Sequence, residues 1–237
     1  MLYKDIQWPL HADWCAVAIM LVVMMTAGCG PRKIAIAPEE RLKLKEEPGI
    51  TAFRYDHSAV FVLIRETDVF HTLTLEKVAV KEEPLIPLQE SFLAAVKTEL
   101  NLDNIRTLPE PRHHGPDYRF RLDRSIEREP DLIQIRRTFQ TGLVFDFDRD
   151  IYIFEPDPFD LHPKPGGKAL YRVHLWAKAS LIRVNEQKIL WQGVCDITDG
   201  GLTLADFRQP IKPLVQEKLD GAIKACAQEL TAQFMGK

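Results

Sequence analysis

The sequence lacks an excess of charge of either sign. Its 237 residues contain 31 lysines and arginines against 34 aspartates and glutamates, which gives a formal net charge of −3. Domains that bind nucleic acids through the phosphate backbone normally carry a clear basic excess. The near-neutral balance therefore predicts that nucleic acid is not a partner.

The sequence also lacks an apolar run long enough to cross a bilayer as a helix. Its longest apolar run without a charge covers residues 14–27, whereas a spanning helix needs about 20 apolar residues. A shorter run close to the N-terminus is typical of the central region of a secretory signal peptide. We therefore predict a signal peptide over residues 1–28. A buried core helix and an uncleaved membrane anchor are the alternatives.

Small residues follow this run directly, as Thr26-Ala27-Gly28-Cys29. This tetrapeptide resembles the lipobox of bacterial lipoproteins, in which the cysteine is acylated and becomes the new N-terminus. The resemblance implies cleavage between Gly28 and Cys29, and palmitate-type acyl chains on Cys29 that attach the protein to a membrane. Gly30 stands where enterobacterial lipoproteins of the inner membrane have aspartate. The resemblance therefore implies an outer-membrane location facing the periplasm.

The segment after Cys29 is polar and charged, and prolines bound it at Pro31 and Pro48. This composition is typical of a linker between an anchor and a domain. We therefore predict a lipidated tether over residues 29–50 and a single folded domain over residues 51–237.

Hydrophobic periodicity in the domain predicts two units in which a β-hairpin precedes an amphipathic helix. In the first unit, we expect strands at 57–65 and 70–80 and a helix at 88–101. In the second unit, we expect strands at 169–184 and 188–197 and a helix at 211–235. The expected fold class is α+β, with an antiparallel sheet built from hairpins and packed by the helices at 88–101 and 211–235.

A proline-rich stretch, residues 103–167, separates the two units. We predict that it is an irregular insert containing a third hairpin, with strands at 132–139 and 143–154. Long irregular segments within a compact domain are usually functional or mobile. The insert is therefore where we expect a specific contact surface.

Two cysteines lie within the predicted domain. Cys195 falls on the apolar side of the second hairpin, and Cys226 falls on the apolar stripe of the terminal helix. Both are therefore expected to face the core between strand and helix. In an oxidising compartment they are candidates for a disulfide. Two buried thiols that do not pair are the alternative.

Arginines concentrate in the insert, with very little lysine. A guanidinium binds phosphate and carboxylate in a bidentate manner, so the cluster is a candidate site for an anionic partner. Acidic residues alternate with these arginines, and a self-neutralised surface is the alternative. The candidate residues are Arg119, Arg121, Arg124, Arg136 and Arg137.

Catalytic and metal-binding motifs are missing from the sequence. It contains no G-x-S-x-G elbow and no H-E-x-x-H pair. Asp146, Asp148 and Asp150 alternate as in a calcium loop, but the required glycine and glutamate do not follow at their places. In a strand, these three acids would form one solvated face. We therefore expect no metal, no cofactor and no enzymatic activity.

The second hairpin carries a further resemblance. Its polar turn at 185–188 leads into Lys-Ile-Leu-Trp at 188–191, ahead of the terminal helix. This arrangement resembles the curli-secretion and penicillin-binding-protein-activator lipoproteins. The resemblance implies an accessory protein that binds a partner, and not a catalyst.

The function expected from the sequence is therefore that of a non-catalytic, lipid-anchored accessory or scaffold protein of the envelope. Its partners would be the membrane, through the N-terminal lipid, and another envelope protein. The first alternative is a carrier or assembly factor for a lipid or glycolipid. The second is an envelope enzyme, which would need a convergent cluster such as Asp146, Asp148 and His162.

Overall fold

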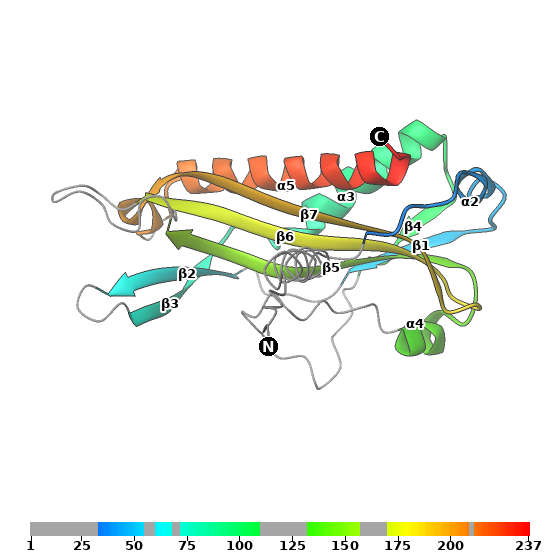
Figure 1. Cartoon of the computed structure of the whole chain (residues 1–237), viewed down its shortest axis with the longest axis horizontal. Helices are drawn as coiled ribbons and strands as arrows, with labels where there is room; N and C mark the ends of the chain where they lie inside the picture. Colours follow the sequence, from blue (N-terminus) through cyan, green and yellow to red (C-terminus); the bar gives the residue numbers. More distant parts are fainter. Residues whose placement is uncertain (1–32, 55–59, 68–71, 110–131, 157–169, 209–210) are drawn as a thin grey trace, which may run out of the picture. The chain divides into compact units, whose positions relative to one another are not determined.

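The computed structural model describes residues 33–54, 60–67, 72–109, 132–156, 170–208 and 211–237 (Figure 1). Their helices and strands, in chain order, are α2 (Pro38–Lys43), β1 (Ile50–Arg54), β2 (Val60–Thr67), β3 (Thr72–Ala79), α3 (Leu85–Leu100), β4 (Ile105–Thr107), α4 (Leu132–Phe139), β5 (Leu143–Pro156), β6 (Leu170–Arg183), β7 (Lys188–Thr203), the 3₁₀ helix η1 (Leu204–Phe207) and α5 (Pro213–Met235). None of the described helices is both long enough and apolar enough to span a membrane.

The seven strands that the structure describes form one sheet, with β5 at its centre. One edge of β5 pairs antiparallel with β6, which pairs antiparallel with β7. The other edge pairs in parallel with β1 and, further along, with β2. β1 adds β4 in parallel, and β2 adds β3 antiparallel. The fold class is α+β as predicted, but the sheet is mixed and not purely antiparallel, because β1 and β2 both join β5 without a hairpin.

The two predicted amphipathic helices are present as α3 and α5, which lie together on one face of the sheet (Figure 1). α3 begins at Leu85, so Pro87 falls in its first turn, where the missing backbone N–H has no partner to lose. α3 ends at Leu100, and the capping residue Asn101 adopts a left-handed conformation with φ 50°. Each helix follows a predicted hairpin, β2–β3 or β6–β7.

The core beneath α3 and α5 is centred on aromatic rings. The ring of Phe92 on α3 lies 5.6 Å from Phe145, 5.5 Å from Phe147, 5.6 Å from Trp191 and 5.9 Å from Phe234, measured between ring centroids. All five side chains are buried. Edge-to-face and offset ring pairs at these distances add to the stability that burial supplies.

The opposite face of the sheet carries α4 and a second, smaller apolar cluster (Figure 1). Ile135 of α4 is fully buried against it, and Leu132 and Phe139 pack at its margin. These three residues are three and four positions apart, which is the spacing of one helix face. The predicted strand over 132–139 was therefore wrong, since this segment is a helix.

Two predicted irregular regions contribute to the folded domain. Within the predicted tether, Ile36 and Leu44 are buried, at 7% and 1% exposed. Within the predicted insert, 143–156 forms the central strand of the sheet. The domain therefore includes residues 33–50. The strand predicted at 143–154 is confirmed as β5, although the insert around it was expected to be irregular.

Candidate functional site

Several residues of the predicted sites lie outside the described part of the chain. Arg136 and Arg137 are described, and both are exposed in the last turn of α4. α4 lies on the face of the sheet opposite α3 and α5 (Figure 1). The residues outside the described ranges are Gly28, Cys29, Arg119, Arg121, Arg124 and His162.

Cys195 of β7 and Cys226 of α5 are joined by a disulfide. Their Cα atoms lie 5.2 Å apart, and both residues are fully buried. The strand alternation and the helix stripe that placed the two cysteines toward one core thus bring them together. The disulfide fixes α5 covalently to the sheet.

The chain is fastened to the sheet directly after the predicted lipidation site. The backbone N–H of Ile34 donates to the carbonyl of Gln192, and the N–H of Gln192 donates to the carbonyl of Ile34, both at 2.9 Å. Val194 lies two residues further along β7. The side-chain amide of Gln233 in α5 donates to the Val194 carbonyl at 2.8 Å and accepts from the Val194 N–H at 3.1 Å. The Gln233 amide therefore satisfies the N–H and the carbonyl of Val194 on the edge of β7.

Further contacts attach this segment to the end of α5. The Arg41 side chain of α2 donates to the carbonyl of Phe234 at 3.3 Å and also to that of Met235. A cation at these last carbonyls is favourable because a helix C-terminus carries partial negative charge. Lys33 adds an ion pair with Glu229 at 3.6 Å. We call residues 33–50 the N-terminal clamp.

The remaining part of the N-terminal clamp is held by Arg183 and Asn104. The Arg183 guanidinium lies 2.7 Å from Glu40 and 3.5 Å from Glu47, and its hydrogen bond lowers the pKa of Glu40. The Asn104 amide donates to the carbonyls of Leu44 at 3.0 Å and Glu47 at 2.8 Å. The N-terminal clamp is therefore a fixed part of the domain.

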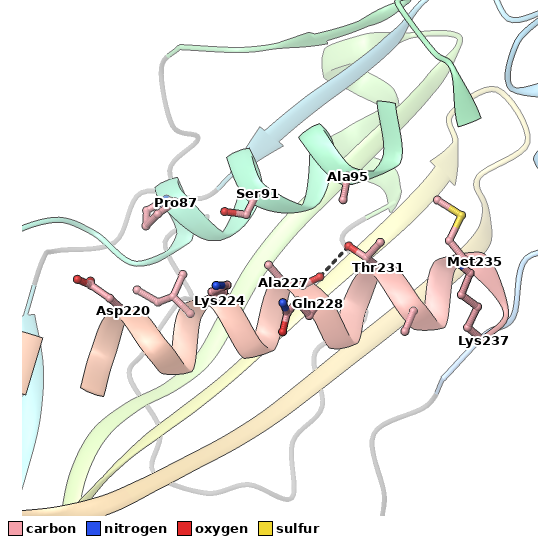
Figure 2. A pocket seen from close by; sticks show the side chains of 12 residues that line it. Pro87, Ser91, Ala95, Asp220, Lys224, Ala227, Gln228, Thr231, Met235 and Lys237 are labelled. Carbon is pink, nitrogen blue, oxygen red and sulfur yellow. Dashed lines mark hydrogen bonds between the residues drawn. The ribbon is translucent and has the colours of Figure 1, made fainter. Parts of the chain in front are cut away.

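A groove of about 600 Å³ runs between the outer sides of α3 and α5 (Figure 2). Its small side chains are spaced four residues apart, which places them on one stripe of each helix. We call it the helix groove. The described lining residues are Pro87, Ser91 and Ala95 of α3, and Asp220, Ile223, Lys224, Ala227, Gln228, Thr231, Ala232 and Met235 of α5, together with Lys237.

The residue types of the helix groove suit binding. Alanine side chains and Ile223 give it apolar walls, while Asp220, Lys224 and Gln228 supply polar groups. Small-molecule and peptide sites typically combine apolar walls with a few polar groups in this way. The described lining residues include no histidine or cysteine. Sequence analysis used only the buried stripes of these helices and did not consider the small residues on their outer sides.

The sheet face opposite the helices contains buried polar side chains. Asp146 and Asp148 are 2% and 7% exposed, so the solvated face predicted for these acids was wrong. In register with them on β6 lie Ser180 and Lys178, which are also buried. The Ser180 hydroxyl donates to Gln192 at 3.3 Å.

A charged network lies further along the same face. The His174 ring nitrogens lie 2.7 Å from an Asp196 oxygen and 3.2 Å from a Glu155 oxygen. Arg172 donates to the same Glu155 oxygen at 2.9 Å and 2.6 Å. Burial raises the pKa of Glu155, but the hydrogen bonds from His174 and Arg172 lower it more, from 4.5 to about 2. The network links β5, β6 and β7.

The Glu155 network predicts a pH-dependent part of the stability. A carboxyl whose pKa is lowered in the folded state stabilises it fully above its unfolded pKa of 4.5, and this contribution disappears as the pH falls toward about 2. Glu155→Gln is therefore expected to lower the free energy of unfolding at pH 7, with a smaller effect at pH 3. Urea denaturation at both values measures the difference.

The matched control for this prediction is Glu90→Gln on the exposed side of α3. It should change the free energy of unfolding little at either pH, because surface substitutions away from such networks have small effects. A loss in Glu155→Gln that is as large at pH 3 as at pH 7 would contradict the role assigned to the ionised carboxylate.

No protein-family model matches the chain, and no curated protein sequence matches it. Among solved structures, it is similar to a DUF330 protein of Xanthomonas campestris, with a TM-score of 0.42, 9% identity, and coverage of 87% of this chain and 90% of that one. It is also similar to the PelC dodecamer of Paraburkholderia phytofirmans, with a TM-score of 0.36, 9% identity, and coverage of 86% and 95%. The Neisseria meningitidis lipoprotein GNA1162 follows with a TM-score of 0.30, 12% identity, and coverage of 71% and 96%.

Proposed function

We propose that the protein is a lipid-anchored, non-catalytic accessory protein of the bacterial cell envelope. It binds another envelope component through the helix groove. The observation that carries the binding role is the groove itself, about 600 Å³ between two helices whose outer sides carry small side chains. This volume lies within the range of roughly 300–1,000 Å³ typical of ligand pockets.

The proposed compartment rests on two independent features. Thr26 to Cys29 resemble a lipobox, and Cys195 and Cys226 form a buried disulfide. Disulfides persist in the periplasm and are rare in the cytosol, where thiols are kept reduced. Gly30 after the lipidated cysteine supports placement at the outer membrane, facing the periplasm.

The proposed partner is a protein segment, helical or extended. Ser91, Ala95 and Ala227 are short, so a partner backbone can approach α3 and α5 closely. An amphipathic helix laid into a groove between helices is a recurring mode of recognition. Asp220 and Lys224 at the groove can fix the register of polar groups on the partner.

Site-specific photo-crosslinking in cells tests this proposal. A benzoylphenylalanine at Ser91, inside the helix groove, should give a discrete protein adduct. The adduct should be lost when Ala95→Trp fills the groove. Ala94→Trp is the matched control, because Ala94 is exposed on the same helix and is not among the described lining residues. An adduct that survives Ala95→Trp would argue against the groove.

The same experiment separates the alternatives. A benzoylphenylalanine at Ile133, which is 60% exposed on α4 beside Arg136 and Arg137, reports on the arginine surface. Adducts at Ile133 and not at Ser91 would move the site to α4. The lipid-carrier alternative is favoured by the apolar contribution of Ile223 and Met235 to the groove. A lipid that co-purifies with the wild type and is lost in Ala95→Trp would replace the protein partner by a lipid.

A further inference from the structure

The chain between the predicted lipidation site and the folded domain is very short. Four residues, 30–33, separate Cys29 from Ile34, and Ile34 is hydrogen-bonded to β7 in both directions. Five residue steps span at most about 18 Å when fully extended. If Cys29 carries the lipid, Ile34 therefore lies within about 18 Å of the acylated residue.

Ile34 lies at a defined end of the domain. The N-terminal clamp attaches there to the last turn of α5, through Arg41 and the carbonyl of Met235. Figure 1 shows α2 and the C-terminus near the same end of α5. α5 covers 23 residues, which corresponds to about 34 Å at 1.5 Å per residue. Lys33, next to Ile34, forms an ion pair with Glu229, which lies 15 residues after Leu214 in α5, or about 22 Å along the helix. Leu214 is therefore further from this point than the roughly 18 Å that the tether can span.

The same end carries the most exposed large apolar side chain among the described residues. Leu42 of α2 is 73% exposed, and the exposed Lys43 and Lys45 lie on either side of Leu44 directly after it. Leucine and lysine are both residue types of segments that rest on a bilayer, where the apolar side chain enters the headgroup region. Exposed Glu39 and Glu46 offset the positive charge of these lysines, so electrostatic attraction to the bilayer is weak. Leu42 and the short tether are therefore the features that favour contact with the membrane.

We infer that the N-terminal clamp is a membrane-contacting surface, with α2 against the headgroups of the anchoring bilayer and Leu42 inserted between them. This inference rests on the proposed lipidation of Cys29. The end of the helix groove that is lined by Met235 and Lys237 then lies at the bilayer surface. A partner in the groove would therefore bind next to the membrane.

The test uses the full-length, lipid-modified protein in liposomes that contain nitroxide-headgroup lipids. A fluorophore is attached at Leu42→Cys or, as the matched control, at Leu214→Cys, an exposed leucine (39%) at the other end of α5. Cys195 and Cys226 are buried in a disulfide and do not react. The label at position 42 should lose most of its emission, and the label at position 214 should keep it. Circular dichroism confirms that both variants are folded.

A 20-residue Gly/Ser insertion between Gly30 and Pro31 should remove much of this difference, because a flexible chain of that length adds roughly 25 Å of reach. Equal quenching at both positions with the natural tether, in protein whose N-terminal mass shows the lipid, overturns this inference and leaves the proposed function in place. An N-terminal mass without lipid overturns both.

Discussion

Replacing Cys29 by serine is expected to shift the protein from the membrane fraction to the soluble fraction and to remove the acyl chains from its N-terminus. In lipoproteins, the cysteine thiol accepts the lipid, and serine lacks that thiol. Each buried methylene of an acyl chain contributes about 0.8 kcal/mol to membrane binding. Loss of the chains therefore removes nearly all of the anchoring free energy. The mass of the mature N-terminus and the distribution between fractions measure both effects.

The control for this prediction is Cys15→Ser in the predicted signal peptide. It should leave the lipid on Cys29 and the membrane fraction unchanged, because Cys15 lies within the segment that is removed. A wild-type protein with an intact Met1 and an unmodified Cys29 would contradict the lipobox interpretation. A Cys29→Ser protein that remains fully in the membrane would favour the uncleaved-anchor alternative for residues 14–27.

Local periodicity was sufficient to predict the two hairpin–helix units. Val215, Leu219 and Ala222 begin the apolar stripe of α5, and all three are buried. Such a stripe depends only on residues within one helix, so it can be recognised in the sequence. The facing cysteines followed from the same logic, because a strand side and a helix stripe that share one core bring Cys195 and Cys226 together.

The arrangement of the sheet could not be predicted in this way. β1 pairs with β5 in parallel, with Ile50 opposite Leu143, and this contact joins segments far apart in the chain. Parallel neighbours need a crossover and share no turn, so no local signal marks them. The hairpin pattern therefore predicted only antiparallel pairs, and the mixed sheet became visible only in the structure.

Short segments between prolines were misjudged for a different reason. Residues 33–50 are mostly polar, and a few tertiary contacts hold them, including the buried Leu44 and the Arg183–Glu40 ion pair. Composition describes the average polarity of such a segment. It does not identify the few side chains that pack or form ion pairs with the rest of the domain. The helix groove was missed because its small residues contribute nothing to a hydrophobic pattern, and become a surface only when α3 and α5 lie side by side.

Removing the disulfide is expected to produce a large loss of stability in the domain. Cys195 and Cys226 are separated by 31 residues, and closing a loop of this size restricts the unfolded chain by about 4 kcal/mol in the chain-entropy model. The Cys195→Ala/Cys226→Ala double variant should therefore lose about 4 kcal/mol of unfolding free energy. For a domain of this size, that corresponds to a decrease in Tm of roughly 8–16 °C. Guanidinium denaturation and calorimetry measure the two quantities.

The position of the bond gives this prediction a second, local consequence. The disulfide connects β7 to the middle of α5, while the Gln233 and Arg41 contacts hold only the last turns of that helix. In the double variant, hydrogen exchange should therefore increase most in the first half of α5 and least near Gln233. Uniformly faster exchange, or an unchanged free energy of unfolding, would show that the core holds α5 without the bond. Wild-type protein made in a reducing cytosol should match the double variant, because it lacks the same cross-link; export to an oxidising compartment would then complete the fold.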